Sequence, residues 1–401
     1  MTNRLDAVCT DSKLVGANSR EAVRLSAASE HPCGRTRVVE IDFHSDRRYE
    51  DFVNSQPGAR IFHHAGWLKA LEAEYSRKFI VLACENENGD IQAVLPLLQT
   101  RGLPFRRVGR QQVGPRLSSL PRSPGGGPVF TSPDHAVALL QAAVERARAS
   151  GRMQLQIKSQ LQFPTELVND LTCVAWRPTY VLEIPNKMEE LRFGDARNRH
   201  NIKWAVKKAE RYGLRVRIAE TERDLHAWYP LYVQTMRRNF VPPRPLRLFV
   251  AMWRNFVPSG LMRLQLAEHQ DGQQRRLVAG SIFLISGDTI LYAFTGVGDK
   301  DLGLHSNDLI LWHSISEACG TGIRWFDFGE VSEDHPQLIR FKTKWGAQPK
   351  DQYRYYSGDQ VRSNGSYFNS RGVLMGLVSA IWRRLPLPVT AQLGDWMYSR
   401  L

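Results

Sequence analysis

The sequence contains the same order of elements twice, and this repetition constrains the fold more than any other feature. In the first half, a helical pattern from Phe62 to about Tyr75 precedes two β-rich runs that an Asn-Gly turn separates. The second half repeats helix, strand, turn and strand between Phe249 and Phe294, about 180 residues later. A hairpin after a helix in both halves indicates two related domains in tandem. We therefore expect an α/β fold of the mixed-sheet (α+β) kind.

Each half continues with a later helix and strand. The helical patterns at residues 136–150 and 307–319 stop at Gly151 and Gly320. Glycine is the residue that most readily adopts the left-handed conformation of a helix end. A short β-rich run follows each glycine, and residues 178–185 have the pattern of a strand leaving the first domain.

The chain therefore divides into four parts. Residues before the first strand pattern at Arg37–Ile41 have no periodicity and few large apolar side chains, which favours a flexible tail. We predict a disordered tail at residues 1–36, a first domain at 37–185, a second domain at 186–358 and an amphipathic helical tail at 366–401.

Composition excludes several classes of protein. Hydrophobic residues make up 42% of the chain and charged residues 23%, which excludes wholesale disorder, a collagen-like repeat and a coiled coil. No apolar run reaches the roughly 20 residues of a membrane-spanning helix, and the start of the chain lacks the apolar stretch of a secretory signal. The five cysteines are scattered and form no Cys-x-x-Cys pair, which indicates a reducing compartment. We expect a cytoplasmic protein.

The net charge of +14 favours polyanionic partners such as RNA, nucleotide phosphates or an anionic membrane face. Half of this excess lies between Arg192 and Arg217, where nine Lys and Arg residues accompany only two acids. Such a segment is either a phosphate-binding surface or a solvated helix face, and the sequence leaves both open.

The C-terminal tail is apolar and basic. Residues 373–382 are apolar but too few to span a bilayer. An apolar stripe at helical spacing follows, formed by Val389, Leu393, Trp396, Met397 and Leu401. A tail of this kind lies in an anionic membrane interface, here at the inner face of the cell membrane, or packs across the domains as a covering helix.

Several well-known site motifs are missing. The sequence has no P-loop, no Gly-x-Gly-x-x-Gly after a strand and no Gly-x-Ser-x-Gly elbow. It also lacks metal-ligand spacings, because His63 and His64 are adjacent and their side chains diverge. We therefore predict no metal site.

The most distinctive stretch is Phe326-Asp327-Phe328-Gly329-Glu330. On a strand, Asp327 lies among aromatic neighbours near the carboxyl end, where open α/β sheets bind ligands. This makes Asp327 a candidate proton acceptor. The alternative is structural, with Asp327 capping the following loop or anchoring Arg340.

Three cations follow at alternating positions, Arg340, Lys342 and Lys344. In an extended chain their side chains would point the same way and form a row. A row of cations suits a phosphate group or a developing oxyanion.

Four motifs occur in order along the chain. They are Phe-His-His-Ala-Gly-Trp-Leu at residues 62–68, Leu-Pro followed by Gly-Gly-Gly-Pro at 120–128, Arg-Asn-Arg-His-Asn-Ile-Lys with Ala-Glu-Arg-Tyr-Gly at 197–213, and Phe-Asp-Phe-Gly with Arg-Phe-Lys-Thr-Lys-Trp-Gly-Ala at 326–347. Together they resemble the FemAB-type branch of the GNAT acyltransferase superfamily. Residues 382–386 resemble the end of members linked to exopolysaccharide systems.

The resemblance implies tandem GNAT-like domains that transfer an acyl or aminoacyl group to an amine. Carried over by position, the second domain holds the active cleft, lined by Tyr292, His305, Asp327, Arg340 and Lys342. Acetyl-CoA enzymes of the superfamily hold pyrophosphate in a Gln/Arg-x-x-Gly-x-Gly/Ala loop before a helix. The matching loop here, residues 296–306, lacks that spacing and contains two acids. Acyl-CoA and aminoacyl-tRNA therefore both remain candidate co-substrates.

Our hypothesis is N-acyl transfer by direct attack of an amine. Asp327, or a water that it orients, would take the amine proton, while Arg340 and Lys342 would stabilise charge on the donor. Substrate binding is assigned to Arg197, Arg199, Lys203, Tyr292, His305 and Lys344.

The acceptor amine is expected to be a small or lipid-linked molecule of the cell envelope or of an exopolysaccharide system. The alternative is a non-catalytic GNAT-like protein that binds RNA or an anionic lipid-linked glycan. Both hypotheses account for the charge of residues 192–217.

Overall fold

The structure is a computed structural model that describes residues 36–101, 107–108, 111–112, 115–151, 153–163, 168–272, 274–357 and 373–400. Apart from Thr36, the tail predicted at residues 1–36 lies outside the described residues. The same holds for residues 366–372 and Leu401 of the predicted C-terminal tail.

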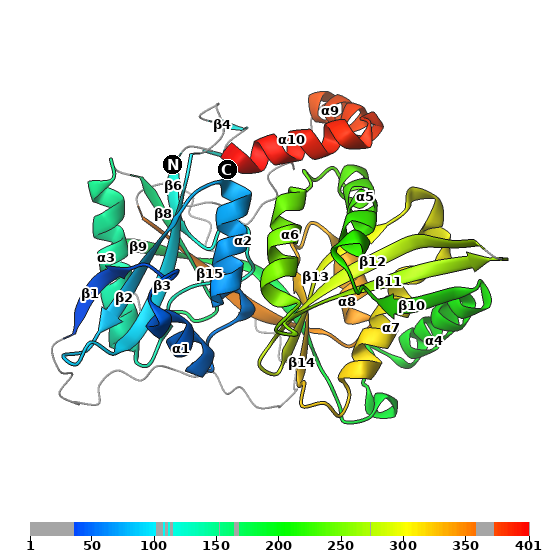
Figure 1. Cartoon of the computed structure of the whole chain (residues 1–401), viewed down its shortest axis with the longest axis horizontal. Helices are drawn as coiled ribbons and strands as arrows, with labels where there is room; N and C mark the ends of the chain where they lie inside the picture. Colours follow the sequence, from blue (N-terminus) through cyan, green and yellow to red (C-terminus); the bar gives the residue numbers. More distant parts are fainter. Residues whose placement is uncertain are drawn as a thin grey trace, which may run out of the picture. The chain divides into compact units, whose positions relative to one another are not determined.

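The described strands are β1 (Arg37–Ile41), β2 (Phe79–Glu85), β3 (Ile91–Thr100), β4 (Arg107–Val108), β5 (Gln111–Gln112), β6 (Arg116–Ser119), β7 (Val129–Phe130), β8 (Gln154–Ser159), β9 (Leu171–Glu183), β10 (Leu214–Ile218), β11 (Met262–Asp271), β12 (Gln274–Ser286), β13 (Thr289–Val297), β14 (Trp325–Glu330) and β15 (Gln348–Ser357). In the part of the chain that the structure describes, 13 of them form one mixed sheet (Figure 1). Its order is β1-β2-β3-β6-β8-β15-β9-β14-β13-β12-β11-β10, with β7 beside β3, while β4 and β5 pair separately.

Two strands join the halves of this sheet. The long β9 pairs with β15 along most of its length, and its last residues also pair with β14. β15 follows the second half in sequence, yet it lies between β8 and β9. Its Tyr356 is the register partner of Gln156 in β8, 200 residues earlier. The sheet thus continues across the boundary predicted at residue 185, and the division into domains stays a prediction.

The described helices are α1 (Arg47–Ser55), α2 (Ala65–Tyr75), α3 (Pro133–Ala149), α4 (Ala196–Arg211), α5 (Glu222–Arg238), α6 (Leu246–Phe256), α7 (Ser306–Ala318), α8 (Pro336–Thr343), α9 (Val373–Arg384) and α10 (Leu387–Arg400), with single 3₁₀ turns η1 (Ile61–His63) and η3 (Met188–Glu190) and a longer one, η4 (Asp299–Leu304). α1, α2, α5 and α6 share one hydrophobic core with strands of both halves. α3 packs in a second core against the first half of the sheet, and α4 and α7 pack in a third against the second half. α2 and α6 lie side by side, so the shared core bridges the two halves (Figure 1).

Local sequence explains where many elements begin and end. The carboxylate of Asp195 caps α4 by accepting from the backbone N–H of Asn198. Gly151 and Gly320, the predicted helix ends, have φ angles of +83° and +72°. β2 and β3 form the predicted hairpin. The expected mixed α/β fold class is therefore confirmed, while α5 is a helix that the sequence analysis did not identify.

A buried ion pair fixes α2 to the segment before α6. Glu74, with no exposed surface, accepts from Nε of Arg244 at 2.7 Å and also from its Nη2. The Arg244 guanidinium lies over the rings of Trp67, Phe294 and Tyr398. Because the two charged residues are 170 positions apart, this pair ties the first half to the second.

In the C-terminal tail, one face of α10 packs on the protein and the other is exposed to solvent. α10 packs on α2 and α5 through the buried Thr390, Gly394 and Tyr398. The predicted apolar stripe is on the other side, since Val389, Leu393 and Trp396 are exposed. No described helix is long and apolar enough to cross a membrane.

We expect Arg244→Met to lower the free energy of unfolding by about 3–5 kcal/mol, because it leaves the Glu74 carboxylate buried without its partner. Urea unfolding measures this loss. The control is Arg254→Met, which removes an exposed guanidinium paired with Glu222 and should cost below about 1 kcal/mol. Equal losses in both variants would contradict a special role for the buried pair.

Candidate active site

Asp327 is buried in β14 and both of its oxygens have partners. Oδ1 accepts from the hydroxyl of Thr179 at 2.5 Å and from the backbone N–H of Gly329 at 2.7 Å. Oδ2 lies 3.6 Å from Nη1 of Arg60. The bond to Gly329, whose φ is +79°, caps the turn in the strand, as the structural alternative expected. The cation beside Asp327 is Arg60, however, and not Arg340.

A cleft of about 660 Å³ opens in front of Asp327, between the two halves. One wall comes from the end of α1 and from η1, including Arg60 and His64. The other comes from β9, β12, β13, β14 and β15, and includes Asp288 and Lys350. The cleft therefore holds two cations, two carboxylates and an apolar lining. Asp288 is thus a second carboxylate beside Asp327, and the sequence analysis did not identify it.

The predicted row of Arg340, Lys342 and Lys344 is wrong, because residues 336–343 form α8 rather than a strand. Successive helical residues turn by about 100°, so side chains two positions apart diverge. Lys342 is buried and donates to the carbonyl oxygens of Gly329 (2.6 Å) and Glu330 (3.1 Å). Lys344 forms an ion pair with Asp308 at 2.5 Å, and Arg340 is exposed.

Lys342 nevertheless belongs to the surroundings of Asp327. Burial lowers the pKa of its ammonium to about 8, while the charges of Asp327 and Glu330 act in the opposite direction. Through its bonds to the carbonyls of Gly329 and Glu330, Lys342 holds the end of β14 that carries Asp327. Its direct role is therefore to position this strand.

β13 and β14 separate directly after Asp327. These parallel strands pair over only three residue pairs, the last being Leu291 with Asp327. Tyr292, the next residue of β13, contacts the ring of Phe328 with centroids 6.3 Å apart, and burial raises the pKa of Tyr292. The strand separation thus lies at the carboxyl end of β14, where sheets of this kind bind ligands.

The loop between β13 and α7 differs from a pyrophosphate cradle. It forms η4, and α7 then begins after His305 without a capping side chain. The two acids of the loop are compensated, since Asp299 pairs with Arg237 and Arg238, and Asp301 pairs with Arg276. The first backbone N–H groups of α7 are therefore free of side-chain caps and of uncompensated negative charge from η4.

The basic helix α4 lies next to the start of α7. The ring of Trp204 meets that of His305 edge to face at 5.3 Å, and Nζ of Lys208 lies 4.7 Å from the Trp204 ring centroid. Burial, together with the charges of Lys208 and Lys344, lowers the pKa of His305. Arg197, Arg199 and Lys203 are exposed on α4 and make no ion pair with any described residue.

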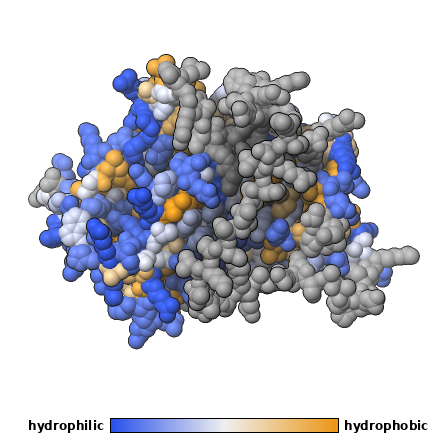
Figure 2. Space-filling model, turned by 180° about the vertical axis from the view of Figure 1, so that it is seen from behind, coloured by the Kyte–Doolittle hydropathy of each residue, from blue (hydrophilic) through white to orange (hydrophobic). Residues whose placement is uncertain are grey.

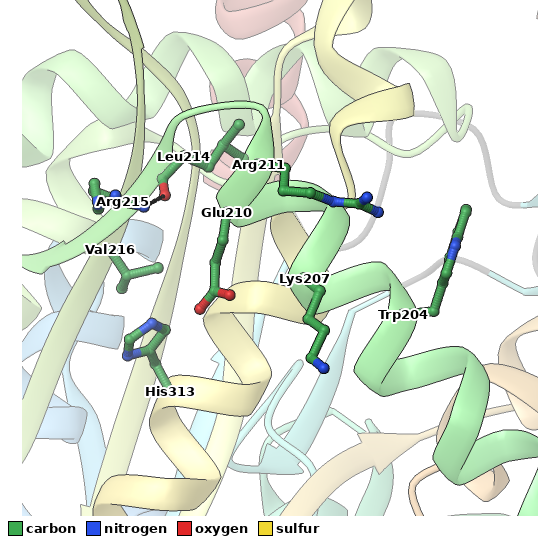
Figure 3. Close-up of a pocket in the computed structure, with 8 residues that line it drawn as sticks. All are labelled: Trp204, Lys207, Glu210, Arg211, Leu214, Arg215, Val216 and His313. Carbon is green, nitrogen blue, oxygen red and sulfur yellow. Dashed lines mark hydrogen bonds between the residues drawn. The ribbon is translucent and has the colours of Figure 1, made fainter.

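A second hollow of about 770 Å³ is lined by the second half of α4, the edge strand β10 and His313 of α7. Figure 3 shows Lys207 and Arg211 extending from α4, while Glu210 points toward His313 of α7. The cationic face of α4 therefore continues to the edge of the sheet.

The structure thus groups the predicted residues into two sets. Asp327 lines the cleft, and Lys342 holds the strand that carries it. His305 and Lys344 lie near the start of α7, beside the basic face of α4. Sequence reasoning missed Arg60, Asp288 and Lys350. Arg60 precedes the motif that begins at Phe62 by two residues. Its partner Asp327 is 267 positions away in the sequence, so no local pattern indicates that the two side chains meet.

Comparisons with known proteins define the class of this fold. Residues 196–342 match the family model described as acetyltransferase (GNAT) domain. No curated protein matches the sequence. The crystal structure of FemX superimposes with a TM-score of 0.61 at 15% identity, covering 79% of this chain and 96% of FemX. The structure of L-PGS from Bacillus licheniformis gives 0.50 at 13% identity, covering 84% and 97%. A conserved protein of unknown function from Bacteroides thetaiotaomicron gives 0.52 at 10% identity, covering 81% and 100%.

At these identities the likeness concerns the fold. The match to the acetyltransferase (GNAT) domain model is confined to residues 196–342, in the second half of the chain. Over 79% of its length the chain has the fold of FemX, which agrees with the fold that the resemblance implies.

The pKa of Lys342 predicts a pH-dependent stability. The folded protein loses this proton near pH 8, whereas the unfolded chain keeps it until about pH 10.5. Between these values the unfolded state binds more protons, so the contribution of Lys342 to the free energy of unfolding rises with pH. We expect the difference between wild type and Lys342→Met to grow by roughly 2–3 kcal/mol in favour of wild type from pH 8 to pH 10.5.

Urea unfolding at several pH values measures this difference. Lys300→Met, at an exposed position, is the control for loss of a lysine. A difference that stays constant or falls across this window would show that Lys342 is not held in the buried site.

Proposed function

We propose that the protein is an N-acyltransferase that transfers an acyl or aminoacyl group to an amine. The observation that carries this proposal is the position of Asp327, which ends the paired part of β13 and β14 and faces the cleft between the halves. The GNAT domain match over residues 196–342 supports the reaction class. The cleft supplies the parts that such a reaction needs, a carboxylate and cations in a partly apolar pocket.

In the proposed reaction, the amine nitrogen of the acceptor attacks the carbonyl carbon of the donor. The new C–N bond forms as the C–S or C–O bond to the leaving group breaks. Asp327, or a water that it orients, takes the amine proton, and the leaving group finally carries a proton away. Arg60 and Lys350 line the same cleft and would stabilise the negative charge on the carbonyl oxygen.

The donor would be acyl-CoA or an aminoacyl-tRNA, both of which carry phosphate. The uncapped start of α7 fits a phosphate group, because its N–H groups have no side-chain cap and the acids of η4 are neutralised. Arg197, Arg199 and Lys203 on α4 would hold a further phosphorylated part of the donor or acceptor. The basic face of α4 favours a long polyanion, so aminoacyl-tRNA remains a candidate donor together with acyl-CoA.

The acceptor would be an amine of the cell envelope or of an exopolysaccharide system, at the inner face of the cell membrane. Three observations support this part of the proposal: the FemX and L-PGS fold, the motif at residues 382–386, and the exposed apolar side of α9 and α10.

We expect Asp327→Asn and Arg60→Met each to lower turnover by roughly 100-fold or more, because they remove the proton acceptor or its charged neighbour. The readout is transfer from labelled acetyl-CoA or charged tRNA to candidate amines, with urea unfolding to verify the fold. Asp170→Asn, an exposed aspartate paired with Arg148, is the matched control. Turnover at wild-type rates in both cleft variants would refute the assigned roles. The sequence analysis assigned charge stabilisation to Arg340 as well, so it also expects Arg340→Ala to lower turnover. The same transfer assay tests this variant.

The non-catalytic alternative rests on two observations. Both oxygens of Asp327 already have partners, and the cations of α4 lack acids to pair with among the described residues. Binding of RNA or of an anionic glycan would then be salt-sensitive and would give no covalent product. Mass spectrometry of the reaction mixtures separates the two functions directly.

The exposed side of α9 and α10 leads us to propose contact with an anionic membrane. Leu377 and Ile381 are 58% and 64% exposed, and Figure 2 shows apolar side chains gathered where α9 lies. Arg383 and Arg384 follow them, and the charge of Asp395 is paired with Arg247. An apolar helix face beside cations matches the interface of an anionic bilayer.

We expect the double variant Leu377→Asp/Ile381→Asp to lose flotation with anionic vesicles, since it places charge where the acyl chains would begin. The control Leu302→Asp changes a leucine of similar exposure (54%) on η4 and should float like wild type. If the double variant floated as well as the control, contact through α9 would be disproved.

A further inference from the structure

A separate cavity of about 260 Å³ lies in the first half of the fold, near the ends of β3 and β6. Its lining comes from α2, from β8, β9, β14 and β15, and from the loop that contains the Leu-Pro motif at residues 120–121. The charged residues in this lining are Arg116, Arg122, Lys158, Arg177, Arg354 and Glu330. Five cations therefore surround the cavity with one carboxylate, and the proposed reaction uses none of these six residues.

Several polar groups of this lining have no hydrogen-bond partner among the described residues. The Arg116 side chain, with only 8% of the residue exposed, makes no ion pair or hydrogen bond with any described residue. The hydroxyls of Tyr75 and Thr100 and the Nε atoms of Arg177 and Arg354 are also buried without a hydrogen-bond partner. Buried donors in this number are unusual, because each one forfeits its hydrogen bonds to water.

Two of the cations, Lys158 and Arg354, are held in place by contacts with neighbouring groups. Lys158, 3% exposed, donates from Nζ to the carbonyl oxygens of Leu120 (2.6 Å) and Ser123 (2.7 Å). The Arg354 guanidinium stacks on the ring of Trp176 at 3.7 Å, and its Nη2 lies 3.7 Å from Oε2 of Glu330. These contacts orient the cations, but Glu330 alone cannot neutralise five of them.

The loop at residues 120–127, which supplies the carbonyl oxygens that hold Lys158, has an unusual backbone conformation. Leu120 and Arg122 have φ angles of +43° and +57°, which non-glycine residues rarely adopt. At Gly127 a Cβ atom would fall 2.3 Å from the carbonyl oxygen of Lys158, so only glycine lets the loop approach β8 this closely. Strain of this kind persists where the surrounding structure holds a site in place.

We propose that this cavity is a binding site for a phosphate-class anion, either inorganic phosphate or the phosphate group of a larger ligand. A phosphate offers several acceptor oxygens, which suits the free donors of Arg116, Arg177 and Arg354 and the two hydroxyls. It would also compensate the excess positive charge. The cavity has the volume of several water molecules of about 30 Å³ each, which is room for one compact anion.

The test is the thermal stability and heat of binding of the full-length protein with inorganic phosphate, pyrophosphate or glucose 1-phosphate, against sodium chloride at equal ionic strength. We expect the wild-type Tm to rise with at least one phosphate compound beyond the effect of chloride. Stabilisation by inorganic phosphate identifies the free ion as a sufficient ligand, and stabilisation by the ester alone identifies a larger ligand.

Arg116→Met should abolish this rise. Because it removes an unpaired buried charge, it should not lower the Tm in phosphate-free buffer. Arg177→Met is a second variant at the same cavity, and Arg254→Met is an exposed control that should keep the rise. Arg199→Met tests whether phosphate binds at α4 instead.

The proposal is overturned if no phosphate compound acts beyond chloride. It is also overturned if the cavity variants keep the rise, or if Arg199→Met alone abolishes it. None of these readouts depends on turnover, so failure of the proposed acyl transfer would leave this test intact.

Discussion

The ion pair between Glu74 and Arg244 holds together the surfaces on which both candidate sites depend. It lies where α2 meets the segment before α6, inside a core that the two halves share. Arg244 also donates to the carbonyl oxygen of Arg122, a residue that lines the cationic cavity. Breaking a pair this deeply buried would leave an uncompensated carboxylate at Glu74, which is strongly destabilising. The pair therefore fixes how the first half faces the second, and with it the cleft that Asp327 lines.

The regular elements could be read from the sequence because their signals are local. The hairpin of β2 and β3 follows from its turn, and the ends of α3 and α7 follow from Gly151 and Gly320. The alternation of Arg340, Lys342 and Lys344 was misleading. Side chains two positions apart lie on the same side only in an extended strand, and this segment is a helix. Pro336 at the first position of α8 was the local sign of a helix.

The site was less predictable because its charges meet across the fold. Asp327 was identified from its aromatic neighbours, yet its cation is Arg60, which sequence distance conceals. The cationic cavity was equally hidden: Arg116, Lys158 and Arg354 belong to three different strands and form no charge cluster in the sequence. The cluster of basic residues on α4 could be recognised from the sequence because its members are close together in the chain. The cations of the cavity become neighbours only because β6, β8 and β15 are adjacent in the sheet.

The insertion of β15 between β8 and β9 has a consequence for synthesis of the protein. A nascent chain that has reached residue 347 still lacks the strand that fills the middle of its sheet. Until then β8 and β9 expose unpaired backbone edges, which attract other strands. Contacts spanning about 200 residues also slow folding, because a long loop must close first. A ribosome stalled before it has translated β15 would therefore hold a chain prone to aggregation.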